Sequence, residues 1–192
     1  MDYQYEVFFS YKRDVQSDEW HIAVKDKLRF WLAHELGRDV QIFLDTEDIR
    51  VGTRWKTKLE DALLASKTIV CVWSPLYFQS QICVSEWKTF VERELSYRRE
   101  LIAPASFIDG ECFPKEAKSR QIMDFSEYTS TAKYFWSTDG AVEFEKRCLR
   151  SFSRDLAALI RQAPPYRPDF PIVEAEKDDV AAEPFIGRIA DV

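Results

Sequence analysis

The sequence is poor in glycine, cysteine and histidine, and these shortages exclude several common kinds of site. The five glycines form neither GxGxxG nor GxxxxGK[ST], so a dinucleotide fingerprint and a phosphate loop are both missing. The four cysteines contain no CxxC pair, and His21 and His34 are thirteen residues apart. No Cys/His/Asp cluster has the spacing of metal ligands. We therefore expect neither a metal site nor a bound cofactor. We expect the cysteines to be free thiols in a reducing compartment.

Long apolar runs and basic runs are also missing. No apolar run approaches the ~20 residues that a bilayer span needs, and the N-terminal residues lack the basic and apolar regions of a secretory signal. The formal net charge is -6 and no Lys/Arg run stands out, which argues against nucleic-acid binding. These absences predict a cytoplasmic protein with neither a membrane nor a nucleic acid as partner.

What the sequence does have is an alternation of strand-like and helix-like segments. Short runs of aromatic and β-branched residues predict five strands, at 5–11, 40–44, 68–73, 101–107 and 121–125. Apolar residues at helical spacing predict helices at 17–36, around 55–63, at 85–97 and at 141–161. Ser17 suits the N-cap of the first helix and Gly37 the position just after its last turn.

This order predicts one α/β domain, a flavodoxin-like three-layer sandwich with a five-stranded parallel sheet. We place the domain at residues 1–162. Residues 163–192 hold five of the eight prolines and an acidic run, which predicts an extended or mobile linker or tail outside the core. Ligands of parallel sheets bind outside the carboxyl ends of the strands, so the loops that start near Ser10, Asp45 and Ser74 are the candidates for a site.

Three segments together resemble the TIR (Toll/interleukin-1 receptor) domain family. Residues 8–14 (FFSYKRD) are similar to its first strand and box, and residues 44–55 (LDTEDIRVGTRW) to the strand and BB loop that follow. Residues 72–86 (VWSPLYFQSQICVSE) are similar to the SPxYxxSxxCxxE run of bacterial-type members. Val51 stands where many animal adaptor members have proline, a departure that favours the enzymatic branch.

The resemblance implies an enzyme that cleaves the nicotinamide–ribose bond of NAD, giving ADP-ribose or a cyclic isomer, in signalling or antiphage defence. It implies that Glu86 is the catalytic carboxylate and that self-association with other TIR domains activates the protein. The alternative for Glu86 is a first-turn glutamate that is favoured by the helix dipole. Cys83 is a poor candidate for a nucleophile because no histidine is placed to activate it.

Further candidates for NAD binding follow the strand ends and the third box. They are Ser10, Tyr11, Lys12, Arg13, Asp45, Trp55, Tyr77, Ser80 and Cys83. Asp45 could instead cap its loop, and Trp55 could belong to the core. Trp73 and Trp87 are interpreted as packing residues.

Two alternatives concern the whole chain. A non-enzymatic TIR scaffold would pair with other TIR domains and would not need Glu86. A phospho-receiver domain is rejected because Trp73 and Ser74 stand where its phosphorylated aspartate would be. Residues 183–188 (EPFIGR) resemble the FxGR lead-in to an NTPase domain, so either a C-terminal NTPase or sensor domain follows, or these residues are an ordinary tail.

Overall fold

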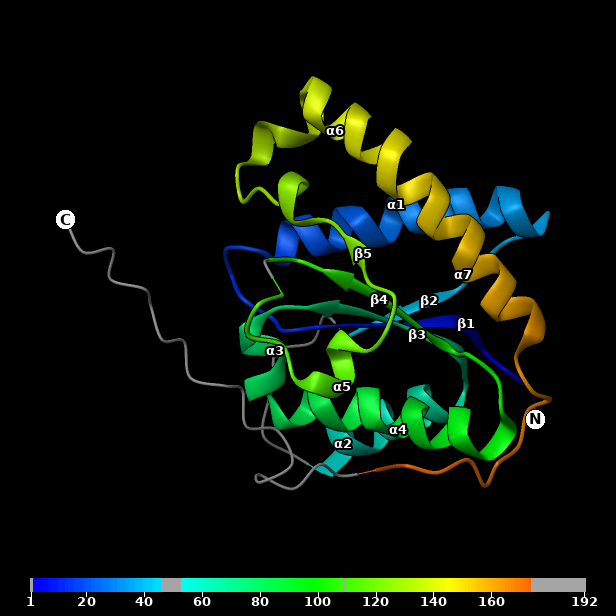
Figure 1. The fold of residues 1–192 in the computed structure, drawn as a ribbon. Helices are drawn as coiled ribbons and strands as arrows, with labels where there is room; N and C mark the ends of the chain where they lie inside the picture. The colour runs from blue at the N-terminus through cyan, green and yellow to red at the C-terminus, as the bar shows by residue number, and fades with distance from the viewer. Residues whose placement is uncertain (1, 46–52, 109, 174–192) are drawn as a thin grey trace.

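A computed structural model of the chain describes residues 2–45, 53–108 and 110–173, and the side chains within them except those of residues 53–55. Its centre is a five-stranded parallel sheet with the strand order β2-β1-β3-β4-β5 (Figure 1). The strands are β1 (Tyr5–Tyr11), β2 (Ile42–Leu44), β3 (Ser66–Trp73), β4 (Ile102–Ser106) and β5 (Met123–Asp124). The predicted fold class is confirmed.

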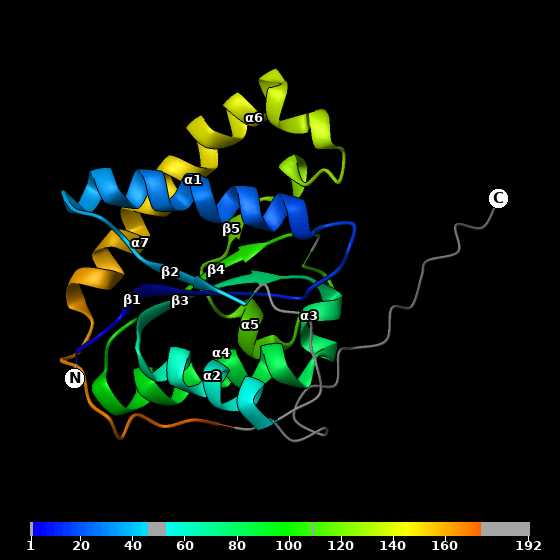
Figure 2. The same cartoon turned by 180° about the vertical axis from the view of Figure 1, so that it is seen from behind.

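Helices cover both faces of the sheet, as Figures 1 and 2 show from opposite sides. One face carries α1 (Asp18–Leu36), α6 (Asp139–Phe144) and α7 (Arg150–Gln162). The other carries α2 (Thr53–Leu64), α3 (Pro75–Gln79), α4 (Gln81–Tyr97) and α5 (Lys115–Lys118). Two short 3₁₀ turns, Ser126–Tyr128 and Lys133–Ser137, lie between β5 and α6.

The alternation of side chains along β1 separates the two cores. Val7 and Phe9 belong to the core under α1 and α7, and Phe8 belongs to the core under α2 and α4. β1 pairs along its whole length with β3, with Ser10 opposite Cys71. This register brings the carboxyl ends of the two central strands to the same edge of the sheet.

The first helix has the predicted bounds and the predicted residues at both ends. Gly37 ends it with φ +67°, a left-handed conformation that glycine adopts without strain. Ser17 occupies the N-cap position, but its side chain accepts no capping hydrogen bond. Its Oγ instead donates to the carbonyl of Asp14 over 3.4 Å, so Ser17 is the predicted N-cap residue but does not cap the helix through its side chain.

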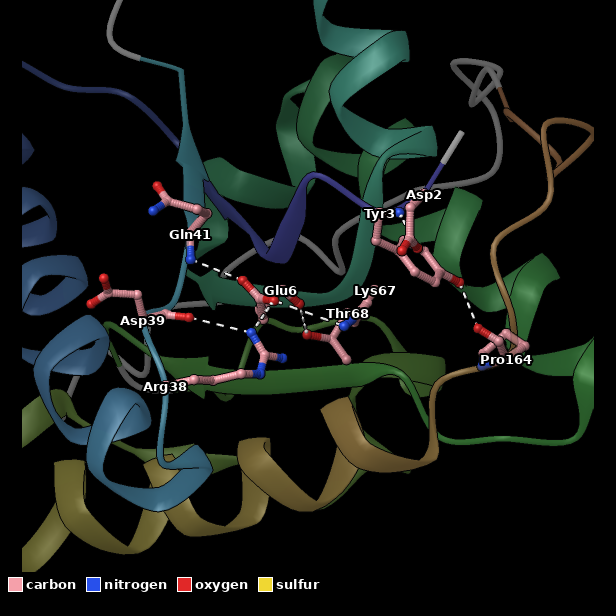
Figure 3. A network of polar contacts seen from close by, with 9 residues as sticks. All are labelled: Asp2, Tyr3, Glu6, Arg38, Asp39, Gln41, Lys67, Thr68 and Pro164. Carbon is pink, nitrogen blue, oxygen red and sulfur yellow. Dashed lines mark hydrogen bonds and ion pairs between the residues drawn. The ribbon is translucent and has the colours of Figure 1, made fainter.

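A polar network around Glu6 fixes the amino ends of β1 and its neighbours (Figure 3). Arg38 Nη1 lies 2.6 Å from Glu6 Oε1, and the backbone N–H of Gln41 donates to Oε2 over 2.9 Å. Lys67 Nζ lies 3.8 Å from the same Oε1. Thr68 Oγ1 donates to the Glu6 carbonyl over 2.8 Å. Glu6 therefore links β1 to β3 and to the residues that lead into β2, at the end of the sheet opposite to Ser10.

Several predicted bounds differ from those of the structure. The predicted strand at 121–125 shortens to Met123–Asp124, and the one at 40–44 begins at Ile42. The predicted helix at 141–161 begins at Asp139 and is interrupted by a π-helical turn at Glu145–Leu149. Such a turn inserts one residue and rotates the apolar stripe, which a search for a constant helical period does not anticipate.

Residues 163–173 form neither helix nor strand, but they are not a tail outside the core. Phe170 is 4% exposed, and its ring centroid lies 4.2 Å from Arg93 Cζ. The backbone N–H of Val173 donates to Thr89 Oγ1 over 3.0 Å. Tyr3 Oη donates to the Pro164 carbonyl over 2.8 Å (Figure 3). The expectation that these residues take no part in packing is wrong, because α4 leaves an aromatic and cationic surface that Phe170 covers.

Candidate functional site

A small cavity, lined by both apolar and polar side chains, lies at the carboxyl ends of β1 and β2, beside the start of α4. Its volume is about 60 Å³. The residues that line it are Phe8, Phe9, Ser10, Tyr11, Lys12, Arg13, Asp45, Ser80, Ile82, Cys83 and Glu86. Eight of the ten residues proposed from the sequence for the site therefore meet at this edge of the sheet, where parallel α/β sheets bind their ligands.

Glu86 is a buried carboxylic acid, not a surface glutamate. Helix α4 begins at Gln81, four residues before the predicted start, so Glu86 lies in the second turn and is only 6% exposed. The alternative of a first-turn glutamate stabilised by the helix dipole is wrong, because Glu86 stands beyond that turn. Burial raises its pKa to about 8, a hydrogen bond from Ser10 opposes the shift, and the charge of Asp45 adds to it.

Ser10 and Tyr77 lie directly behind Glu86. Ser10 Oγ donates to Glu86 Oε2 over 2.5 Å and lies 2.8 Å from the hydroxyl of Tyr77. Tyr77 is fully buried and does not line the cavity. Its position in α3 follows from local sequence, because Pro75 begins that helix and Ser74 Oγ accepts the Tyr77 N–H over 3.2 Å.

The helix start beside the cavity is built by Ser80 and Cys83. Ser80 is the N-cap of α4, and its Oγ accepts from the Cys83 N–H over 3.5 Å. Cys83 Sγ points at the Tyr11 carbonyl, 3.5 Å away. Burial raises the pKa of Cys83 to about 12. The thiol therefore stays protonated at neutral pH, which agrees with the prediction that Cys83 is not a nucleophile.

The remaining candidates differ in their solvent exposure. Lys12 is exposed, Arg13 and Asp45 are half-buried, and all three line the cavity. The Tyr11 ring stacks on His21 with 4.2 Å between centroids, within the core under α1. Sequence reasoning did not identify this stacking partner. Burial lowers the pKa of His21 to about 4, so the ring is neutral there.

Three tryptophans were singled out from the sequence, and the structure describes the side chains of two of them. Trp73 and Trp87 are buried with 5.5 Å between their ring centroids, which confirms them as packing residues. The side chain of Trp55 lies outside the described residues, as does the BB-loop stretch at 46–52.

Within the described chain, the cysteines are free thiols, and no group of three His, Cys, Asp or Glu side chains could hold a metal. No helix described is long and apolar enough to cross a bilayer.

Comparisons with known proteins find a family model and solved structures that are similar to this chain. A family model described as "TIR domain" matches residues 7–134. The TIR domain of the Toll-related receptor TRR-2 from Hydra magnipapillata superimposes with a TM-score of 0.51 at 19% identity, over 80% of this chain and 98% of that one. The TIR domains of the activated Roq1 resistosome recognising the effector XopQ give 0.43 at 16% identity, over 81% and 85%. No curated protein matches the sequence.

Proposed function

Because the chain belongs to the TIR domain family, we propose that it cleaves the nicotinamide–ribose bond of NAD, with Glu86 as the catalytic carboxylate. The products would be nicotinamide and ADP-ribose or a cyclic isomer. The observation that carries the proposal is the buried Glu86, with a pKa of about 8, at the wall of a small cavity that Lys12, Arg13 and Asp45 also line. Perturbed acids in such cavities are candidates for catalysis.

The chemistry suits a single carboxylate. Nicotinamide leaves as a neutral pyridine, so the leaving group needs no general acid. Positive charge develops on the ribose ring as the bond breaks, and an adjacent negative charge stabilises it, as in glycosidases. The same carboxylate can orient a water molecule, or a ribose hydroxyl, for attack on the anomeric carbon.

This role needs the ionised form of Glu86, which is the minor form at neutral pH when the site is empty. The nicotinamide ring of NAD carries a positive charge, and an opposite charge nearby lowers the pKa of a carboxyl group. Substrate binding would therefore ionise Glu86 at the moment when its charge is useful. Lys12 and Arg13 would meet the phosphates, and Asp45 the ribose hydroxyls.

A second candidate function is a scaffold that acts only by pairing with other TIR domains. The volume of the cavity favours it, since about 60 Å³ is well below the roughly 300–1,000 Å³ of most small-molecule sites.

An enzyme with this site must widen it or complete it with a neighbouring copy. We therefore propose a cytoplasmic effector, in signalling or antiphage defence, that is activated by self-association.

Incubation of the purified protein with NAD, alone and fused to a clustering tag, tests the proposal. Chromatography of the products would separate nicotinamide, ADP-ribose and cyclic isomers. Release of nicotinamide that is lost in Glu86→Gln would support the enzyme. Clustered wild-type protein that releases none would favour the scaffold, with or without a C-terminal NTPase partner.

A further inference from the structure

Three buried polar side chains from three elements form a hydrogen-bonded row that ends at Glu86. The row runs from the Tyr77 hydroxyl to Ser10 Oγ over 2.8 Å, and from Ser10 Oγ to Glu86 Oε2 over 2.5 Å. The exposed fractions fall from 6% at Glu86 to 2% at Ser10 and 0% at Tyr77. A phenol with no solvent exposure does not meet a ligand, so its hydroxyl serves another protein group.

The row is held by rigid elements on every side. Ser10 lies in β1 within its pairing with β3, and Glu86 lies in the second turn of α4. Tyr77 stands in α3, with its ring 5.4 Å from that of Phe78. None of the three groups needs a change of backbone conformation to keep these contacts.

The hydrogen bonds have one consistent direction. Burial raises the pKa of Tyr77 well above 10, so the phenol keeps its proton and donates. Its possible acceptors are Ser10 Oγ and the thiol of Cys71. Sulfur is the weaker acceptor, so the phenol favours Ser10. Ser10 has one proton, which then goes to Glu86 Oε2.

The two oxygens of Glu86 are therefore not equivalent. Oε2 is occupied as an acceptor, and among the described residues no group donates to Oε1. Glu86 lines the cavity, so Oε1 is the oxygen left for a ligand and for the carboxyl proton. A chain of hydrogen bonds of this kind strengthens each of its members and fixes the orientation of the last one.

We propose that Tyr77 and Ser10 are positioning residues that lock Glu86 Oε2, so that Oε1 is the oxygen that faces the anomeric carbon of a ribosyl substrate. The assignment of the reacting atom rests on the proposed function, whereas the row itself does not. Ser10 and Tyr77, placed among the NAD-binding candidates from the sequence, thus act through Glu86 and not on NAD.

The ionisation of Glu86 can be measured without any substrate. NMR titration of protein labelled with ¹³C at the glutamate carboxyl groups gives its midpoint, and the signal missing in Glu86→Gln identifies it. Ser10→Ala removes the donor to the carboxylate, so the midpoint should rise by on the order of one pH unit. Ser106→Ala is the matched control, a buried serine at the end of β4 that donates to Asp124. It should leave the midpoint unchanged.

Tyr77→Phe tests the direction of the row, because it removes only the hydroxyl. Alone it should raise the midpoint by less than Ser10→Ala does. In the Ser10→Ala background it should add nothing, because Tyr77 reaches Glu86 only through Ser10. An additive effect of the two changes, or a midpoint that neither variant moves, would overturn the row. If Tyr77→Phe does not fold, the titration of Ser10→Ala alone decides.

Catalysis gives the second readout. Both variants should lower kcat more than they raise KM, and Ser10→Ala should move the acid limb of kcat/KM to higher pH, whereas a purely structural loss would not move that limb. Variants that keep the wild-type limb and kcat would overturn the role of the row in catalysis. Wild-type protein that releases no nicotinamide would refute the proposed function, while the titration would still decide on the row.

Discussion

Ser10 Oγ lies 2.5 Å from Glu86 Oε2, although 76 positions separate the two residues in the sequence. The contact joins the end of β1 to the second turn of α4 and closes the inner wall of the cavity. It supplies the buried carboxyl group with a strong donor, but burial still raises its pKa to about 8.

Glu86→Gln should abolish most activity without harming the fold. Glutamine has nearly the shape of the protonated acid, and it can still accept from Ser10, so the packing should survive. It cannot carry the negative charge that the ribosyl cation requires, which typically costs on the order of 100-fold to 1000-fold in rate. Nicotinamide release is the measurement, with circular dichroism as the check on folding. Glu92→Gln, an exposed change on the same helix, should keep the wild-type rate.

The pH dependence of activity should follow the ionisation of Glu86. The active form is the carboxylate, so kcat/KM should rise with pH and level off above about 8, the pKa of the empty site. The limb in kcat should lie at lower pH, because the cationic nicotinamide favours the carboxylate in the complex. Rates over pH 5–9 with saturating and with limiting NAD separate the two limbs. A kcat/KM limb near pH 4.5 would mean that Glu86 titrates like an exposed glutamate.

Turnover should depend on association. The cavity of about 60 Å³ is small for NAD, so a neighbouring copy is expected to widen or complete it. Specific activity should therefore increase with protein concentration, and more strongly with an artificial clustering tag. Constant specific activity over a hundredfold range of concentration, with only monomer seen by light scattering, would indicate a self-sufficient subunit.

The sequence predicted the fold well where a strand is buried on both faces. β1 and β3 are rich in aromatic and β-branched residues, and their bounds differ from the predicted ones by at most two residues. The prediction was poorer at β5, where only Met123 and Asp124 pair with β4. A two-residue edge strand carries no period, so its neighbours determine it and its composition does not.

The sequence predicted which residues form the site better than it predicted what each of them does there. Eight candidates from the three boxes line the cavity, but the sequence predicts only a loop between Ser74 and the helix at 85–97. The structure instead has the short helix α3 there, and α4 begins directly after an N-cap at Ser80. Glu86 therefore lies one turn further into its helix than the sequence predicts. Whether a carboxyl group is solvated or buried depends on that single turn. Contacts across 67 positions, such as Tyr77 with Ser10, have no local signal at all.

His21 should destabilise the protein in mild acid. Its pKa falls from 6.5 to about 4 in the folded state, mainly through burial, so the unfolded state takes up a proton first as the pH falls. Stability from this group should be complete above pH 6.5 and lost by pH 4, by on the order of 3 kcal/mol. Urea unfolding of wild type and His21→Phe, which keeps an aromatic ring beside Tyr11, isolates the effect. Equal pH dependence of the two proteins would mean that the pKa of His21 does not differ between the folded and unfolded states.

Phe170 should contribute to the stability of the domain through Arg93. The guanidinium lies between two rings, with Cζ 4.3 Å from the Phe90 centroid and 4.2 Å from that of Phe170, and it is not solvent-exposed. Phe170→Ala removes buried apolar surface and one of these two contacts, while water that then reaches Arg93 offsets part of the loss. The expected cost is on the order of 3 kcal/mol in unfolding free energy. Arg167→Ala, an exposed change in the same segment, should leave the stability unchanged.

A chain that ends after Pro165 should melt at a lower temperature than the full chain, since it lacks Phe170 altogether. Equal melting temperatures for the truncated and full chains would mean that the contacts of residues 166–173 contribute nothing to the stability of the domain.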